Sequence, residues 1–152
     1  MRLLLGLALS LSFVACGGSP FVGTWTGTNL TVSDPLIKGA DADVTFTATN
    51  ISAAITLKDG SNQKIASVTA AGTYTSTDKQ ITVTITSVSG SDNAGTALAT
   101  STKDGAQCAS LVGQEVCVPN QTSDYTISGD VLTTSLKSSG GTVFTLKVKK
   151  KA

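Results

Sequence analysis

Strict alternation of apolar and threonine side chains is the feature of this sequence that most constrains its fold. Between residues 81 and 86 every odd position is isoleucine or valine, and every even position is threonine. Related two-residue patterns recur in residues 44–49, 53–57 and 144–148. Successive side chains of a strand point to opposite faces, so this pattern predicts half-buried strands with one apolar face. No helical period is present after residue 20.

Turn residues divide this pattern into eight or nine short strands. Asp59-Gly60 and Ser128-Gly129-Asp130 predict hairpins, and residues 76–79 and 138–141 predict further turns. Consecutive strands with short links predict an all-β fold, an antiparallel up-and-down barrel of about eight strands. A β-sandwich is the alternative.

Two stretches in the middle of the chain lack a regular period. Residues 89–95 are small and polar, which predicts a loop. Residues 96–113 are expected to form a long connection in which strands are weak or absent.

The first residues form a separate targeting segment. Met1-Arg2 gives a positive start, and residues 3–14 form an apolar run that is too short to span a bilayer as a helix. The alternative, a buried N-terminal helix, would need a polar face that this run lacks. We therefore expect an exported protein with a signal peptide at 1–15, a tether at 16–20 and a folded domain at 21–152.

The end of this segment carries a more specific motif. Phe13-Val14-Ala15-Cys16 resembles the lipobox of bacterial lipoproteins. The resemblance implies cleavage before Cys16, a diacylglycerol on its sulfur and an amide-linked third acyl chain, which together anchor a protein stably in a membrane. It places the protein in the bacterial cell envelope, and Gly17 is compatible with outer-membrane sorting. Ordinary cleavage nearby, which would leave Cys16 as a free thiol, is the alternative.

The two remaining cysteines, Cys108 and Cys117, are nine positions apart. In an oxidising compartment such a pair predicts a disulfide. A metal site is the rival interpretation. The chain has no histidine, however, and two thiolates alone rarely hold a metal, so we predict no metal and no cofactor.

The supply of charged and titratable residues limits the chemistry of the chain. After removal of Arg2, ten lysines balance ten acidic residues, so no basic field attracts nucleic acid. No histidine is available as a general base at neutral pH. Asp41 and Asp43 could form a carboxylate pair, but their position indicates a solvated strand start. We therefore predict no catalytic residues and no enzymatic activity.

Gly23-Thr24-Trp25, placed directly after the lipobox and tether, resembles the G-x-W motif on the first strand of lipocalins. Residues 125–132 and 141–149 resemble the closing hairpins of small exported proteins of this type. The resemblance implies an eight-stranded barrel with Trp25 plugging one end. Lipocalins often pack an arginine against this tryptophan, and Lys147 or Lys149 would take that place here. Gly23 and Gly27 flank Trp25 and are expected to leave room for the indole or to let the strand bend.

Two binding functions remain open. In the first, the barrel holds a small apolar ligand; the candidate lining residues are Trp25, Phe46, Tyr74 and Phe144, which could equally be ordinary core. In the second, a filled barrel is a scaffold whose loop at residues 103–122, closed by Cys108 and Cys117, contacts an envelope protein or peptidoglycan. An inhibitor that presents this loop to an enzyme is a third hypothesis. An empty interior would favour the first.

Overall fold

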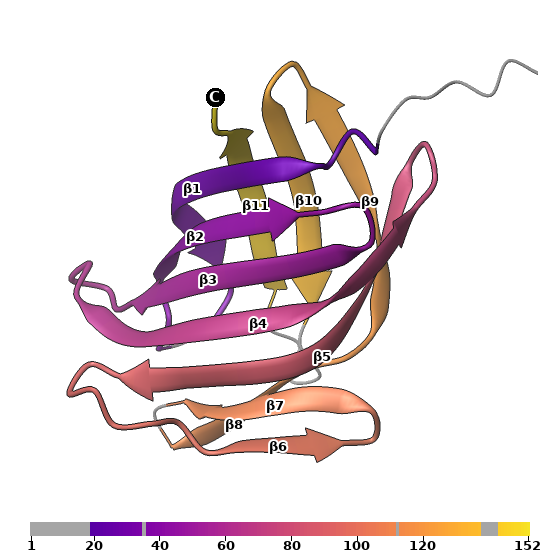
Figure 1. Ribbon diagram of the computed structural model, residues 1–152. Helices are drawn as coiled ribbons and strands as arrows, with labels where there is room; N and C mark the ends of the chain where they lie inside the picture. The colour runs from indigo at the N-terminus through magenta and orange to yellow at the C-terminus, as the bar shows by residue number, and fades with distance from the viewer. Residues whose placement is uncertain (1–18, 35, 112, 138–142) are drawn as a thin grey trace, which may run out of the picture.

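The structure, a computed structural model, describes residues 19–34, 36–111, 113–137 and 143–152. Eight antiparallel strands close into a barrel, as the alternation predicts (Figure 1). These strands are β1 (Gly23–Val32), β2 (Gly39–Phe46), β3 (Asn50–Lys58), β4 (Lys64–Ser76), β5 (Gln80–Asp92), β9 (Gln121–Ser128), β10 (Val131–Lys137) and β11 (Val143–Lys150).

The barrel is an up-and-down meander with one insertion. Neighbouring strands follow one another in sequence around the barrel, except where β5 pairs with β9. Between these two strands the chain forms a second sheet of β6 (Thr100–Lys103), β7 (Ala106–Leu111) and β8 (Gln114–Val118). This small sheet lies beside β5 (Figure 1).

The small sheet sits where the wall of the barrel is incomplete. β5 pairs with β9 only over Gln80–Val83, although β5 itself continues to Asp92. Beyond Val83 the free side of β5 is therefore not covered by β9. There the backbone N–H of Leu98 donates to the carbonyl of Gly90, and β7 contacts β5. The small sheet thus continues the wall of the barrel.

Two expectations for the middle of the chain are wrong. Residues 89–92 belong to β5 rather than to a loop, because their backbone pairs with residues 66–69 of β4 whatever their side chains are. Residues 96–113 contain β6 and β7, not a connection with weak or absent strands. β7 is buried on both faces over most of its length, so its sequence lacks the alternation of apolar and polar residues from which a strand could be predicted.

Most predicted turns are confirmed. Residues 59–63 close the β3–β4 hairpin, but the residue with positive φ is Asn62 (61°), not Gly60. Asp59 instead fixes this turn through its Oδ1, which accepts the backbone N–H groups of Ser61 and Gln63. Gly129 (φ 61°) closes the β9–β10 hairpin. The predicted turn at 138–141 lies outside the described residues.

Glycine lets the first strand bend. A Cβ at Gly27 would lie 2.9 Å from the carbonyl oxygen of Lys147 and 2.8 Å from the side chain of Leu30. The register of β1 with β2 shifts between Gly27 and Leu30. Gly27 therefore gives room to β11 and to Leu30, rather than to the indole of Trp25.

The predicted signal peptide and the predicted lipidation site, Cys16, lie outside the described residues. In the ranges that the structure describes, no helix is long and apolar enough to cross a membrane.

Candidate ligand-binding site

Aromatic side chains fill the end of the barrel at which the described chain begins. Phe21 is fully buried, and its ring lies 5.3 Å from that of Phe46, 5.6 Å from Tyr74 and 4.7 Å from Tyr125, measured between centroids. Tilted and edge-to-face pairs at these distances are favourable beyond the area they bury. This end of the barrel is packed core.

Trp25 belongs to the same closed end. Its indole is 1% exposed, and its Nε1–H donates to the carbonyl of Phe21 at 2.7 Å. The ammonium of Lys150 lies 5.5 Å from the centroid of the indole. The expectation that Lys147 or Lys149 would take this place is wrong, because Trp25 and Lys150 are direct partners in the β1–β11 register.

Tyr74 ties the start of the chain to the barrel. Its hydroxyl is 2.8 Å from the carbonyl oxygen of Thr47, which accepts, and 3.1 Å from Oγ of Ser19. Thr47 lies in the β2–β3 turn, so this one hydroxyl joins the segment before β1 to a turn on the barrel rim.

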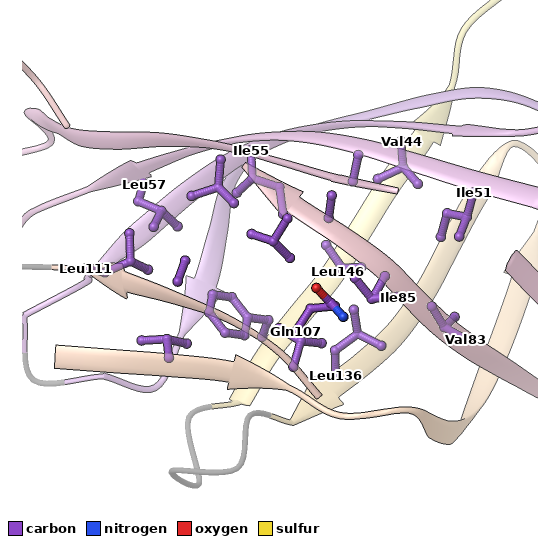
Figure 2. Close-up of a pocket in the computed structure, with 18 of the residues that line it drawn as sticks. Val44, Ile51, Ile55, Leu57, Val83, Ile85, Gln107, Leu111, Leu136 and Leu146 are labelled. Carbon is purple, nitrogen blue, oxygen red and sulfur yellow. The ribbon is translucent and has the colours of Figure 1, made fainter. Parts of the chain in front are cut away.

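A cavity of about 130 Å³ lies in the other part of the barrel (Figure 2). Its walls come from β2–β5, from β10 and β11, and from the small sheet. Nearly all of the lining side chains are aliphatic: Val44, Ile51, Ala53, Ile55, Leu57, Val68, Ala70, Val83, Ile85, Val88, Ala109, Leu111, Val116, Val118, Leu136 and Leu146. Phe144, Gln107 and Lys137 complete the lining.

A row of small side chains creates this space. Val44, Ala53, Ala70 and Val88 are direct neighbours across β2, β3, β4 and β5, and all four line the cavity. In the row nearer the aromatic end, by contrast, Phe46 is paired with Ile51. Small residues on the inward face leave the barrel unfilled at this level.

The small sheet closes part of the cavity. Ala109 and Leu111 of β7 and Val116 and Val118 of β8 line it. Leu111 is 6% exposed and belongs to the same apolar core as the barrel strands. The insertion between β5 and β9 is therefore a wall of the candidate site.

The four aromatic residues proposed from the sequence divide into two groups. Phe144 lines the cavity, whereas Trp25, Phe46 and Tyr74 lie in the closed aromatic end. Sequence reasoning missed the aliphatic residues that form most of the site. In the sequence, alternation puts Ala53, Ile55 and Leu57 on the inward face of one strand. Ala70 is a small residue at an inward position where a large residue would have filled the barrel.

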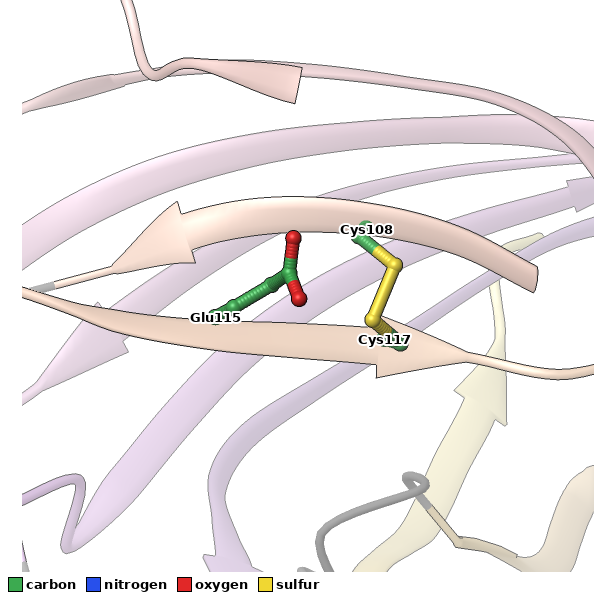
Figure 3. Close-up of side chains that lie close together, drawn as sticks. All are labelled: Cys108, Glu115 and Cys117. Carbon is green, nitrogen blue, oxygen red and sulfur yellow. A yellow bond between two sulfur atoms is a disulfide. The ribbon is translucent and has the colours of Figure 1, made fainter. Parts of the chain in front are cut away.

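Cys108 and Cys117 form the predicted disulfide, which joins directly paired residues of β7 and β8 (Figure 3). The cavity-lining residues of β7 have odd numbers, so Cys108 lies on the opposite face of the strand. Glu115 lies beside the disulfide; its carboxylate accepts a hydrogen bond from Ser101 and pairs with Lys103 at 3.6 Å. With both sulfurs bonded to each other, neither is a thiolate that could hold a metal.

Asp41 and Asp43 lie within β2, on the face opposite to the buried Ala42 and Val44; the expected strand start is wrong, because β2 already begins at Gly39. Asp41 forms an ion pair with Lys58 at 2.6 Å, and Asp43 forms one with Lys151 at 2.9 Å. Hydrogen bonds from the Lys151 ammonium and then from Thr26 hold the pKa of Asp43 below its usual value. Asp41 and Asp43 thus serve cross-strand ion pairs on the outside of the barrel.

Comparison with known proteins identifies no family. No protein-family model matches this sequence, and no curated protein matches it. Among solved structures, a de novo designed fluorescence-activating β-barrel is similar at a TM-score of 0.39 and 14% sequence identity, over 86% of this chain and 94% of the designed one. The description of the fold rests on the strand pairing itself.

Proposed function

We propose that this protein binds a small apolar molecule inside the barrel and performs no chemistry on it. The observation that carries the proposal is the cavity of about 130 Å³ with almost wholly aliphatic walls. An engineered cavity of about 150 Å³ with similar walls, in an unrelated protein, stays dry and takes up benzene. A ligand of about six carbon atoms therefore matches this space.

We propose an apolar ligand because the lining residues offer almost no partners for a polar group. Each buried methylene group contributes about 0.8 kcal/mol, whereas a buried polar group without a partner costs free energy. The walls formed by β3, β4 and β5 supply only aliphatic side chains to the cavity. The side chain of Gln107 is the one neutral polar group among the described lining residues.

The residues around the cavity also support binding without catalysis. No histidine is present in the chain, and none of the described lining residues is acidic or carries a hydroxyl. General acid–base or nucleophilic catalysis uses such groups, or a lysine amine, beside the ligand, and Lys137 is the one lysine among the described lining residues.

We further propose that the barrel is a lipocalin-like domain anchored in the cell envelope through Cys16. Burial of Trp25 at one end of an eight-stranded barrel supports the lipocalin-like interpretation. Ser19 bonds to Tyr74 at the aromatic end, and three residues of chain span at most about 11 Å. An anchor on Cys16 would therefore hold the aromatic end next to the membrane.

The alternative function, in which residues 103–122 contact an envelope partner, stays a prediction. Part of this segment is packed inside the protein, because Leu111 of β7 and Val116 of β8 line the cavity. The cavity therefore favours binding of an apolar ligand over the scaffold hypothesis.

Toluene is a suitable probe of the proposed function. In a methyl NMR titration of the purified protein, we expect shifts at Ile51, Ile55 and Ile85, which line the cavity, and none at Val22, which is exposed. The melting temperature should rise with toluene concentration, since the ligand binds the folded state. Equal shifts at cavity and surface methyl groups, or none, would refute the proposal.

A further inference from the structure

We infer that the ligand of this cavity is aromatic, and that its ring packs against Phe144. This inference rests on the proposed function and narrows the ligand class from apolar molecules in general to compact aromatic hydrocarbons.

Phe144 is the one aromatic residue among the described residues that line the cavity. It alternates with Leu146 and Val148 on the inward face of β11, where Leu146 also lines the cavity and Val148 is 1% exposed. Phe21 and Phe46 are buried, whereas Phe144 is only half-buried. The Phe144 ring therefore keeps accessible surface on the side of the barrel wall that borders the cavity.

The Phe144 ring has no aromatic partner within the described residues. The other described phenylalanine and tyrosine rings pair with one another at the closed end of the barrel; they are Phe21, Phe46, Tyr74 and Tyr125. The register partners of Phe144 are aliphatic, namely Val32 of β1 and Leu136 of β10. An aromatic ligand would supply the ring partner that the protein does not.

The wall opposite Phe144 leaves room for a ring. β4 and β11 are opposite strands of the closed barrel, with three strands between them on either side (Figure 1). Val68 and Ala70 of β4 line the cavity, and so does Ala53 of the adjacent β3. The volume of about 130 Å³ is close to that of an engineered cavity that takes up benzene. A single ring without a long chain therefore matches the space between Phe144 and this wall.

The pairing of two rings gives the site a preference among apolar molecules. An offset or edge-to-face ring pair strengthens a contact by about two- to ten-fold beyond the effect of the buried area. A saturated ligand of similar shape buries a similar apolar area against Phe144 but gains no ring–ring interaction. The aliphatic walls thus determine that an apolar molecule binds, and Phe144 determines which one is preferred.

Toluene and methylcyclohexane separate this inference from the proposed function, because both are a methyl-substituted six-carbon ring and only toluene is aromatic. We would measure both dissociation constants by NMR titration for the wild type, Phe144→Leu and Phe46→Leu. Phe46 lies in the closed aromatic end and does not line the cavity, so Phe46→Leu is the matched control. Comparing the preference for toluene between variants cancels the difference in hydration of the two ligands.

We expect Phe144→Leu to lower the preference for toluene over methylcyclohexane by about two- to ten-fold, whereas Phe46→Leu should keep the wild-type preference. A second measurement needs no substitution. In the wild type with bound toluene, we expect nuclear Overhauser effects between the toluene ring protons and the ring protons of Phe144.

Two results would overturn the inference and leave the proposed function standing. The first is an unchanged preference in Phe144→Leu while both ligands bind. The second is Overhauser effects from toluene to Ile55 and Leu146, which line the cavity, with none to Phe144. If neither ligand binds the wild type, the inference and the proposed function both fail.

Discussion

Lys150 lies over the indole of Trp25, with its Nζ 5.5 Å from the ring centroid, and the two residues are direct partners between the last and the first strand of the barrel. Gly23 makes this approach possible. A Cβ at Gly23, whose φ is 131°, would lie 2.8 Å from Cε of Lys150. The contact therefore closes the barrel at the seam where its first and last strands meet.

Replacing Lys150 by methionine should destabilise the protein by about 0.5–1 kcal/mol, because an exposed cation–π contact contributes that much. Urea unfolding measures the change. Lys147→Met, on the same strand but away from the indole, should change stability by less than about 0.5 kcal/mol, as surface substitutions do. Equal effects of the two substitutions would show that the cation–π contact does not stabilise the seam.

Removal of the Tyr74 hydroxyl should cost more than removal of the Tyr125 hydroxyl. Tyr74 is 5% exposed, and its hydroxyl lies within hydrogen-bonding distance of two oxygens. At about 0.5–1.5 kcal/mol for each bond, Tyr74→Phe should destabilise the protein by about 1–3 kcal/mol.

Tyr125→Phe is the matched control for this prediction. The Tyr125 hydroxyl makes one exposed bond, to the carbonyl of Thr77, so its loss should cost less than about 1 kcal/mol. Chemical denaturation of both variants compares them, and a larger loss in Tyr125→Phe would contradict the account of the aromatic end.

The barrel could be predicted from the sequence because most of the strands have one polar and one apolar face, which gives an alternating pattern. The threonines at 82, 84 and 86 are such a case, and the structure places this segment in β5. The same alternation in β11 also identifies the lysine that contacts Trp25. Phe144, Leu146 and Val148 are the inward residues of β11, so the lysine with their parity, Lys150, is the one that reaches Trp25.

The candidate site was harder to predict because it depends on neighbours across strands. Ala53 and Ala70 are unremarkable in sequence, and only their direct pairing places two small side chains side by side in the wall. The contribution of β7 could not be predicted either. In β7 the apolar Leu111 and the disulfide-bonded Cys108 are both buried, on opposite faces, so no alternation marks the strand.

The disulfide should stabilise the small sheet. It closes a loop with a sequence separation of 9, for which the chain-entropy model gives about 2.5–3 kcal/mol. The double variant Cys108→Ala/Cys117→Ala should lose amide protection in β7 and β8 first, as measured by hydrogen exchange. Unchanged protection in these strands would show that the disulfide does not hold the sheet.

The ion pair between Asp43 and Lys151 should make stability depend on pH in the acid range. The pKa of Asp43 is below its usual value of 3.8 in the folded state, because Lys151 and Thr26 donate hydrogen bonds to the carboxylate. The resulting stabilisation is complete above about pH 5 and is lost as the pH falls through 3.8 and then through the lowered folded pKa. The pair is about half exposed, so screening keeps its contribution below about 1 kcal/mol.

Asp43→Asn should therefore flatten the stability profile below pH 4, as followed by urea unfolding at several pH values. In a Lys151→Met background the same substitution should have a smaller effect. An equal effect in both backgrounds would show that Lys151 is not the main cause.

Filling the aliphatic cavity shows whether it is a binding site. Ala53 lines the cavity and Ala54, its neighbour on β3, is exposed, so Ala53→Leu and Ala54→Leu add the same atoms to opposite faces of one strand. We would measure toluene affinity for the wild type and both variants by NMR titration, after checking that all three are folded. We expect Ala53→Leu to weaken toluene binding at least ten-fold, about 1.4 kcal/mol, and Ala54→Leu to bind toluene as the wild type does. Equal affinity in all three folded proteins would show that toluene does not bind in this cavity.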